Sequence, residues 1–419
     1  MSNTIKPADR LSGVGEYYLQ RKMKEVAALN ARGLDIISLG IGGPDMMPPA
    51  EAIETLCTQA RRPDTHSYQL GIGVPELRKA FADWYARYYG VTLDPAAEIL
   101  PLSGSKEGIT FISLAFLNPG DKVLVPDPGY PTYTSVSKLV GAGIVKYPLT
   151  EKDGWQPDFD ALEASDLSGV KLMWLNYPHM PTGARARRET FERSVNFGRR
   201  HGILIVNDNP YSFILNDKPM SILEVPGARD TAVELNSLSK AHNMAGWRMG
   251  MVAGKPEFIQ YILKVKSNID SGQFKPLMLA AAKALSMGDG WFGALNAEYR
   301  RRRAAAEEVM AAMGVSIDPS QSGLFLWGRI PDSEASGEAM ADRILAEARV
   351  FITPGFIFGE NGDRYVRISL CAPAEKLREA AGRIHKIRIL TDAGMHPGAS
   401  ANKDLVSDAS GSIPTIQAK

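Results

Sequence analysis

The sequence has few of the features that mark secreted, membrane or metal-binding proteins. Its two cysteines, Cys57 and Cys371, are too few for a disulfide framework. No apolar run approaches the ~20 residues that cross a bilayer, and the N-terminal residues MSNTIKPADR lack the apolar core of a signal peptide. No C-x-x-C or H-E-x-x-H pattern offers a metal site. We therefore expect a cytoplasmic protein with no bound metal and no membrane partner.

Neither sign of charge predominates. The chain of 419 residues has 48 Lys and Arg against 47 Asp and Glu, a net charge of +1. Proteins that bind nucleic acid normally have a basic surplus or a basic face, so we expect no nucleic-acid partner. The basic run Arg300 to Arg303 lies inside a helical pattern, Phe292 to Met313, and is interpreted as a solvated helix face.

The apolar content of 44% and the length favour a large core and two domains. From about residue 75 to 255, β-rich runs alternate with helical patterns such as 75–89, which predicts parallel βαβ units. Several expected strands are continuous apolar runs, as in strands buried on both faces. Beyond about residue 285 the pattern changes to helices with short strands at 324–330, 350–353 and 365–369. The sequence therefore predicts a domain boundary near 280–290.

One lysine has an unusual setting. Lys240 follows the strand-like run 231–236, within the sequence Ser237-Leu-Ser-Lys-Ala-His-Asn-Met-Ala-Gly-Trp-Arg248. Small hydroxyl residues before it and Arg248 after it suit a lysine that forms a Schiff base beside a phosphate site. From the residues alone, a surface lysine and a phosphate-binding lysine are alternatives.

A second segment, Ser103-Gly-Ser-Lys-Glu-Gly108, stands between an expected strand end and a helix start. Backbone N–H groups at a helix start, reinforced by the helix dipole, bind anions, although an ordinary turn has the same composition. Ser237, Ser239 and Arg248 supply donors suited to the same phosphate. The two segments together predict a phosphate cup.

A carboxylate, Asp208, follows the apolar run 203–206. Ligands of open α/β sheets bind at the carboxyl ends of strands. A buried ionised carboxylate is costly without a cationic partner, and a protonated pyridine ring would be one. The alternative for Asp208 is a helix cap or turn residue, because Asp-Asn-Pro is also turn chemistry.

The motifs of this chain, and their order along it, resemble those of the class I/II, fold type I, pyridoxal-phosphate-dependent aminotransferases. The resemblance is to the branch of LL-diaminopimelate and aspartate aminotransferases. The similarity extends over about residues 17–389. Its motifs are Leu39-Gly-Ile-Gly42, Tyr68 with Gly73 and Leu77-Arg78, Ser103-Gly-Ser-Lys106, Pro128-Gly-Tyr130-Pro131, Pro181-Thr-Gly183, Asp208-x-x-Tyr211, Ser237-x-Ser-Lys240, Arg248 and Tyr365-Val-Arg367.

The resemblance implies an α/β fold with a mostly parallel seven-stranded sheet in a large domain and a smaller α/β domain. It implies an enzyme that moves an amino group from an L-amino acid to a 2-oxo acid by a ping-pong cycle, with pyridoxal 5′-phosphate (PLP) as cofactor. The expected division is an N-terminal segment contributing to the small domain, 1–45; a large PLP-binding domain, 46–285; a small C-terminal domain, 286–390; and a mobile tail, 391–419.

The resemblance also implies roles for single residues at the cofactor. Lys240 would hold PLP covalently and then move a proton as general base and acid. Asp208 would keep the pyridine nitrogen protonated, Tyr211 would donate a hydrogen bond to the phenolic oxygen, and Tyr130 would stack on the ring. The phosphate would be held by the backbone of Ser105 and Lys106 and by Ser237, Ser239 and Arg248.

Tyr68 corresponds to a residue that reaches the phosphate of a neighbouring subunit, which implies a homodimer with shared active sites. Arg367 would bind the substrate α-carboxylate bidentately, helped by the backbone of Gly42; an edge salt bridge is the alternative for Arg367. One of Tyr17 and Tyr18 would line the substrate pocket.

Two other functions are compatible with these motifs. The same cofactor chemistry supports β-elimination, decarboxylation or Cα oxidation of an amino acid, and half-reaction spectra would separate these from transamination. A cofactor-binding regulator would need a DNA-binding segment, and only about 35 residues precede the first strand motif, which leaves no room for a helix-turn-helix.

One position departs from the family pattern. Relatives have an asparagine before Pro-Thr-Gly that donates to the cofactor's phenolic oxygen, whereas this chain has Met180, which cannot donate. The neighbouring His179 could compensate, but ordinary packing is the preferred interpretation of that residue.

We expect the loss of this donor to leave the phenolic oxygen freer to bind the imine proton, so that the pKa of the imine formed by Lys240 is higher than in relatives. A pH titration of cofactor absorbance in the native protein and in Met180→Asn tests this. The variant should titrate at lower pH, and identical midpoints would contradict the hypothesis.

Overall fold

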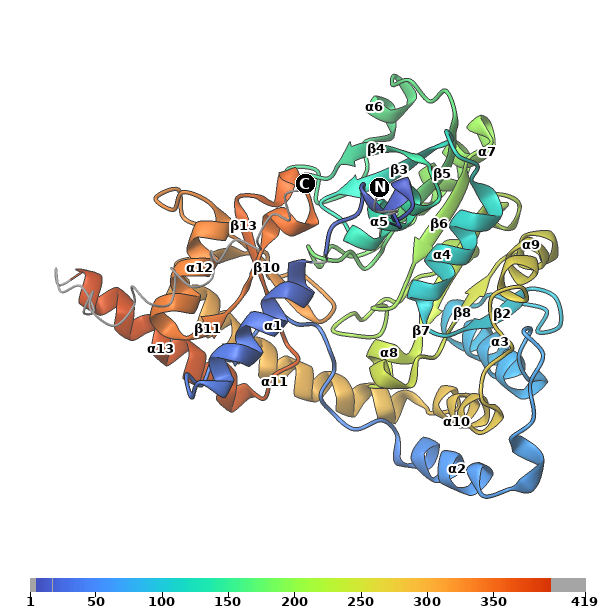
Figure 1. Cartoon of the computed structure of the whole chain (residues 1–419), viewed down its shortest axis with the longest axis horizontal. Coiled ribbons are helices and arrows are strands. Elements are labelled where there is room, and N and C mark those ends of the chain that lie inside the picture. The colour runs from blue at the N-terminus through green and yellow to red at the C-terminus, as the bar shows by residue number, and fades with distance from the viewer. Residues whose placement is uncertain (1–4, 17, 393–419) are drawn as a thin grey trace.

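The computed structural model describes residues 5–16 and 18–392 (Figure 1). The tail expected at 391–419 lies outside the described residues from residue 393 onward. In Figure 1 a larger part, built around a seven-stranded sheet, lies on the right and a smaller part on the left. Helix α11 (Asp289–Met313) extends from the neighbourhood of α10 into the smaller part.

The central sheet has the strand order β2-β8-β7-β6-β5-β3-β4. Strand β8 pairs antiparallel with β2 and β7, and the other neighbours pair parallel. The expected α/β class with a mostly parallel seven-stranded sheet is therefore confirmed. The strands are β2 (Ile99–Leu102), β3 (Lys122–Asp127), β4 (Gly143–Pro148), β5 (Val170–Leu175), β6 (Leu204–Asp208), β7 (Ala232–Ser237) and β8 (Gly250–Ala253).

Apolar clusters cover both faces of this sheet. On β6, Leu204 and Val206 pack into one cluster and Ile205 into the other. Both faces are therefore dry, which explains why the strands are continuous apolar runs. The helices of this part are α2 (Ala50–Ala60), α3 (Pro75–Tyr89), α4 (Ser105–Phe116), α5 (Pro131–Leu139), α6 (Phe159–Glu163), α7 (Arg188–His201), α8 (Leu238–Ala241), α9 (Pro256–Lys266) and α10 (Lys275–Leu285).

The smaller part contains an antiparallel sheet with the order β12-β13-β10-β9. Strand β1 (Ile37–Ser38), from the N-terminal region, pairs with β11 (Val350–Phe351) beside it. Figure 1 shows α1 (Tyr18–Ala31) against the same part. The remaining elements are β9 (Ser316–Ile317), β10 (Phe325–Arg329), β12 (Thr353–Pro354), β13 (Tyr365–Ser369), α12 (Gly337–Ala348) and α13 (Ala374–Asp392).

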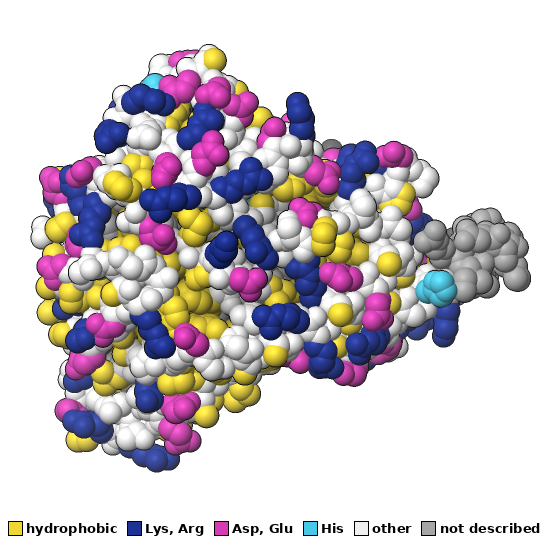
Figure 2. Space-filling view, turned by 180° about the vertical axis from the view of Figure 1, so that it is seen from behind, with side chains coloured by type: hydrophobic (Ala, Val, Ile, Leu, Met, Phe, Trp, Pro, Cys, Tyr) yellow, Lys and Arg dark blue, Asp and Glu magenta, His cyan; other side chains and the backbone are white. Residues whose placement is uncertain are grey.

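The surface is mixed in charge. Figure 2 shows Lys and Arg side chains interspersed with Asp and Glu across one face, as the net charge of +1 leads one to expect, with hydrophobic side chains gathered in the middle of the larger part. Within residues 5–16 and 18–392, no helix is both long and apolar enough to pass through a membrane.

An aromatic cluster in the larger part encloses a histidine. His242 is 2% exposed, and its ring lies 5.5 Å from the ring of Phe292 and 6.4 Å from that of Trp84. Neither ring nitrogen has a hydrogen-bond partner among the described residues. Burial lowers the pKa of this imidazole to about 3, because the apolar surroundings disfavour the charged form.

We expect His242→Phe to raise the free energy of unfolding at pH 7 by about 1 kcal/mol or more, because two buried unpaired polar atoms are removed while the ring packing is kept. Between pH 6.5 and about 3 the unfolded imidazole binds a proton that the folded one does not. The native protein therefore loses stability over this range, and the variant lacks that loss.

Chemical denaturation of both proteins at pH 7 and pH 5 measures the difference. The difference in free energy of unfolding between the variant and the native protein should be larger at pH 5 than at pH 7. A variant that is less stable than the native protein at pH 7 would contradict the interpretation. So would a difference in free energy of unfolding that is the same at both pH values.

Candidate active site

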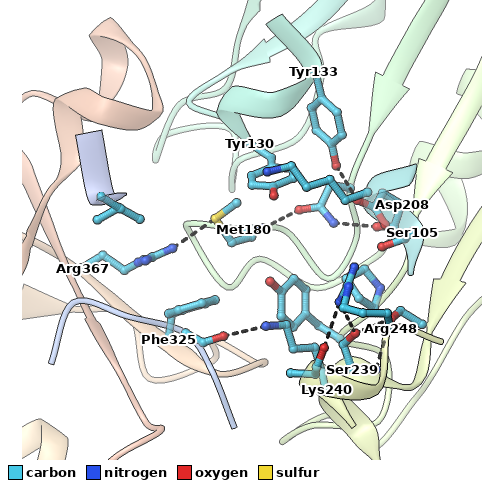
Figure 3. Close-up of a pocket in the computed structure, with 18 residues that line it drawn as sticks. Ser105, Tyr130, Tyr133, Met180, Asp208, Ser239, Lys240, Arg248, Phe325 and Arg367 are labelled. Atoms are coloured by element: carbon cyan, nitrogen blue, oxygen red, sulfur yellow. Dashed lines mark hydrogen bonds between the residues drawn. The ribbon is translucent and has the colours of Figure 1, made fainter. Parts of the chain in front are cut away.

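A pocket of about 420 Å³ lies between the carboxyl ends of the parallel strands and the smaller part (Figure 3). Asp208 and Lys240 approach it from the large sheet, and Arg367 and Phe325 from the smaller one. The residues that were expected in the site from the sequence and line this pocket are Gly42, Ser105, Lys106, Tyr130, Asp208, Tyr211, Ser237, Ser239, Lys240, Arg248 and Arg367.

Lys240 lies in the short helix α8, directly after β7. Its Nζ donates a hydrogen bond of 2.6 Å to the carbonyl oxygen of Gly42. Burial lowers the pKa of Lys240, and the charges of Arg367 and Arg248 act in the same direction. A lysine whose ammonium is destabilised in this way is suited to act as a nucleophile and as a base.

Asp208 ends β6 and is 4% exposed. Its Oδ2 accepts a hydrogen bond of 3.0 Å from the hydroxyl of Tyr133, and that ring stacks on Trp174 with centroids 4.8 Å apart. Its Oδ1 has no partner among the described residues. Burial raises the pKa of this carboxyl to about 7, partly offset by the Tyr133 hydroxyl, the Ser105 side chain and the charge of Lys240. A buried carboxylate oxygen without a donor fits the protonated nitrogen of a pyridine ring.

The strand order β2-β8-β7 brings the two segments of the expected phosphate cup together. Helix α4 begins at Ser105 with no side chain capping its N-terminus, so its first backbone N–H groups can bind an anion. Arg248 donates to the backbone oxygen of Ser103 at 3.2 Å and approaches Ser239 Oγ at 3.5 Å. The hydroxyls of Ser237 and Ser239 are 2.8 Å apart. This arrangement can hold a phosphate.

Arg367, on β13, is 3% exposed and lies between two aromatic rings. Its guanidinium carbon is 3.9 Å from the ring centroid of Phe325 and 4.6 Å from that of Phe358. Its Nη2 donates to the carbonyl oxygen of Gly40 at 2.9 Å, and its Nη1 approaches the sulfur of Met180 at 3.2 Å (Figure 3). The stacked guanidinium borders the pocket and can bind a carboxylate.

Two of the expected residues that the structure describes, Tyr68 and Tyr18, do not line the pocket. Tyr68 is 90% exposed. Tyr18 turns its ring toward Phe356, with centroids 5.5 Å apart, and the residue that lines the pocket instead is its neighbour Leu19. Tyr17 lies outside the described residues.

The pocket also contains residues that the motifs did not single out: Leu19, Tyr133, Asn176, Pro210, Ala245 and Phe325. Tyr133 could have been found, because it follows Tyr130 by about one helical turn. Asn176 donates to the backbone oxygen of Asp208 at 2.6 Å and accepts from the Met180 N–H at 2.8 Å. Met180 lines the pocket, where the asparagine was expected.

His179 is buried outside this lining. Its Nδ1 lies 2.8 Å from the Thr182 hydroxyl, and its ring packs near Tyr177 with centroids 5.6 Å apart. These contacts favour the packing interpretation over compensation for Met180.

A lysine after a parallel strand, a buried carboxylate and an anion cup at one edge of the sheet are the arrangement that the resemblance to fold type I PLP enzymes led us to expect. The chain belongs to the aminotransferase class I and II family, whose model matches residues 34–384. It is a PLP-dependent aminotransferase, so the expected family, cofactor and enzyme class are confirmed.

Individual proteins similar to this chain are also aminotransferases. The LL-diaminopimelate aminotransferase of Nitratidesulfovibrio vulgaris (strain Miyazaki F) is 40% identical over 383 residues, 91% of this chain and 98% of that protein. The same enzyme of Aquifex aeolicus is 40% identical over 387 residues, 91% of this chain and 99% of that protein. Substrate-bound BacF from Bacillus subtilis has a TM-score of 0.87 at 35% identity, covering 92% of this chain and 98% of that one.

A probable N-succinyldiaminopimelate aminotransferase from Thermus thermophilus has a TM-score of 0.82 at 33% identity, covering 88% of this chain and 99% of that one. These relatives favour transamination over elimination, decarboxylation or oxidation. They also favour an enzyme over a regulator.

We expect Gly104→Ala to weaken PLP binding. Gly104 has φ of +82°, and a Cβ there would lie 2.1 Å from Arg248 Nη2, so the guanidinium would be displaced from the cup. The dissociation constant for PLP, measured by absorbance titration, should rise at least about tenfold, or about 1.4 kcal/mol.

Gly246→Ala is the matched control, because a Cβ at that position meets no described atom within 4 Å. If Gly104→Ala and Gly246→Ala bound PLP equally well, the assignment of the cup would be wrong.

Proposed function

We propose that Lys240, Asp208 and Arg367 carry transamination between an L-amino acid and a 2-oxo acid in this pocket. The observation that supports this most directly is that the three side chains, from two different sheets, line one cavity. Each has the chemistry that its role requires: a lysine with lowered pKa, a buried carboxylate with one oxygen that accepts no hydrogen bond from the described residues, and a stacked guanidinium.

When bound, PLP supplies an aldehyde that reacts with amines and an electron-withdrawing ring that weakens the bonds at the substrate α-carbon. Lys240 would hold it covalently, Asp208 would pair with the ring nitrogen, and Tyr130 would stack on the ring. Tyr211, whose hydroxyl pKa is raised by burial, stays protonated and donates to the phenolic oxygen.

The phosphate group anchors the cofactor in the same proposal. Its donors are the backbone N–H groups of Ser105 and Lys106, the hydroxyls of Ser237 and Ser239, and the Arg248 guanidinium. Their position at the start of α4, with β8 and α8 alongside, supports this assignment.

Lys240 then acts as the proton carrier. With a substrate amine in its place on the cofactor, the neutral amine of Lys240 would accept the proton from the substrate α-carbon and donate it to C4′ of the cofactor. The carbonyl oxygen of Gly42 lies within hydrogen-bond distance of Nζ and orients the amine. Arg367 holds the substrate carboxylate, with the backbone of Gly42 beside it, and the rings of Phe325 and Phe358 keep water from the guanidinium.

We also propose the domain division 1–45, 46–285, 286–390 and 391–419. Pairing of β1 with β11 supports the assignment of the N-terminal segment to the small domain. Packing of Leu19 and Val26 with Leu345 supports it as well. A cytoplasmic location is part of the proposal, since both cysteines are free.

A homodimer with shared active sites completes the proposal. Tyr68, Leu70, Ile269 and Phe274 are all exposed apolar or aromatic side chains. Their two loops are neighbours, because the ring of His66 lies 5.7 Å from that of Phe274. An exposed apolar surface of this kind is typical of an interface between subunits. In the dimer, Tyr68 reaches the phosphate of the partner subunit.

The proposed function predicts the spectroscopic outcome of a single half-reaction. The holoenzyme is mixed with a series of amino donors. LL-diaminopimelate is tested first, because relatives of this chain are named LL-diaminopimelate aminotransferase. At least one donor should convert the cofactor to pyridoxamine phosphate with release of one equivalent of 2-oxo acid, and added 2-oxo acid should restore the original absorbance.

Lys240→Ala should slow this conversion by at least about 10²-fold, the lower range for loss of a general base. Lys255→Ala, which changes a surface lysine paired with Glu257, serves as the control. Release of ammonia with recovery of the original absorbance, or no response to any donor, would contradict transamination.

A further inference from the structure

Two arginines of the basic run on α11 are largely shielded from solvent, and one of them, Arg303, still exposes 15% of its side chain. The sequence predicted a solvated face for Arg300 to Arg303, and Arg300 and Arg301 are indeed exposed. Arg302, by contrast, is 4% exposed. The prediction is therefore wrong for Arg302. A buried guanidinium is retained only where its donors find partners.

The partners of Arg302 lie on three different segments. Its two terminal nitrogens bind the carboxylate of Asp45, at 2.6 and 3.2 Å. Its Nη1 also donates to the carbonyl oxygen of Leu370 at 3.2 Å, and its Nε to Glu298 at 2.7 Å on the same helix. Arg302 thus joins α11 to the segment before α2 and to the end of β13.

The segment anchored by Asp45, residues 39–45, crosses from β1 to the larger part along the active site. Its carbonyl oxygens accept from both proposed functional cations: Gly40 from Arg367 at 2.9 Å, and Gly42 from Lys240 at 2.6 Å. There is little freedom in its placement, because a Cβ on Gly42 would lie 2.2 Å from the Phe325 ring.

The other partner, Leu370, follows the strand that carries Arg367. The Ser369 N–H, one residue earlier, donates to the Leu39 carbonyl oxygen at 2.7 Å, so β13 and segment 39–45 already touch at this end. Arg302 joins the other end of segment 39–45, at Asp45, to the end of β13, at Leu370. The backbone of Gly42 and the guanidinium of Arg367 are therefore held in register from both sides.

We propose that Arg302 is a positioning residue for the substrate carboxylate: it fixes segment 39–45 against β13 so that Gly42 and Arg367 converge on one carboxylate. This inference rests on the proposed role of Arg367. Lysine cannot replace Arg302, because a single ammonium lacks the planar fork that binds Asp45 bidentately while also reaching Glu298 and Leu370.

The test uses the holoenzyme and compares two donors: an amino acid accepted by the native enzyme, and the amine that lacks only its α-carboxylate. Arg302→Lys should lower kcat/KM for the amino acid at least about tenfold, mainly through KM. The slow reaction of the amine, measured in single turnovers, should change less than about twofold, because it does not use the carboxylate site.

The matched control is Arg301→Gln. Arg301 pairs with the same Glu298 and with Glu375, but its side chain is 45% exposed. This variant should react like the native enzyme with both donors. Asp45→Asn should reproduce the selective loss of Arg302→Lys, and the double variant should lose little more than either single one.

Equal losses for amino acid and amine would mean that Arg302 has only a general structural role, and unchanged kinetics would mean that it has none; either result overturns the inference. The variant Arg367→Lys distinguishes a failure of the inference about Arg302 from a failure of the proposed function. If Arg367→Lys lowers the reaction of the amino acid and that of the amine by the same factor, the assignment of Arg367 to the substrate carboxylate is wrong.

Discussion

The constraint on which the site depends is the burial of the Asp208 carboxylate at the end of β6. A charged carboxylate there costs several kcal/mol unless a cation or donors compensate it. Tyr133 satisfies one oxygen, and the other has no partner among the described residues. The raised pKa of Asp208 expresses this cost. A cationic ring nitrogen would remove it, so the same feature that destabilises the protein alone favours the cofactor.

The rest of the pocket follows from how two sheets meet around that position. The large sheet contributes the proposed cofactor side, because adjacent strands end together at one edge and place Asp208, Lys240 and the proposed phosphate donors there. The smaller sheet contributes Arg367 and its stacking ring Phe325. Neither sheet forms the site alone. Their relative placement depends on contacts such as the segment 39–45, which bonds to side chains from both.

The sequence predicted best what local chemistry decides. Helix α3 has the bounds that Pro75 and Gly90 predict, since Gly90 takes a left-handed conformation with φ of 65°. Helix α10 was not foreseen, because its sequence is mostly alanine and leucine and its course depends on packing against both α2 and α3. Phe325 was missed for another reason: its place depends on packing between sheets. The burial of Arg302 depends on Asp45, which lies 257 positions away.

Reductive trapping shows which lysine holds the cofactor, and Lys240 is the lysine proposed. Sodium borohydride converts the linkage between PLP and its lysine into a stable secondary amine, which survives proteolysis and is located by mass spectrometry. We expect a phosphopyridoxyl group on the peptide that contains Lys240 and on no other. Its attachment to a different lysine of the pocket, such as Lys106, or the absence of any labelled peptide from the reduced holoenzyme, would contradict it.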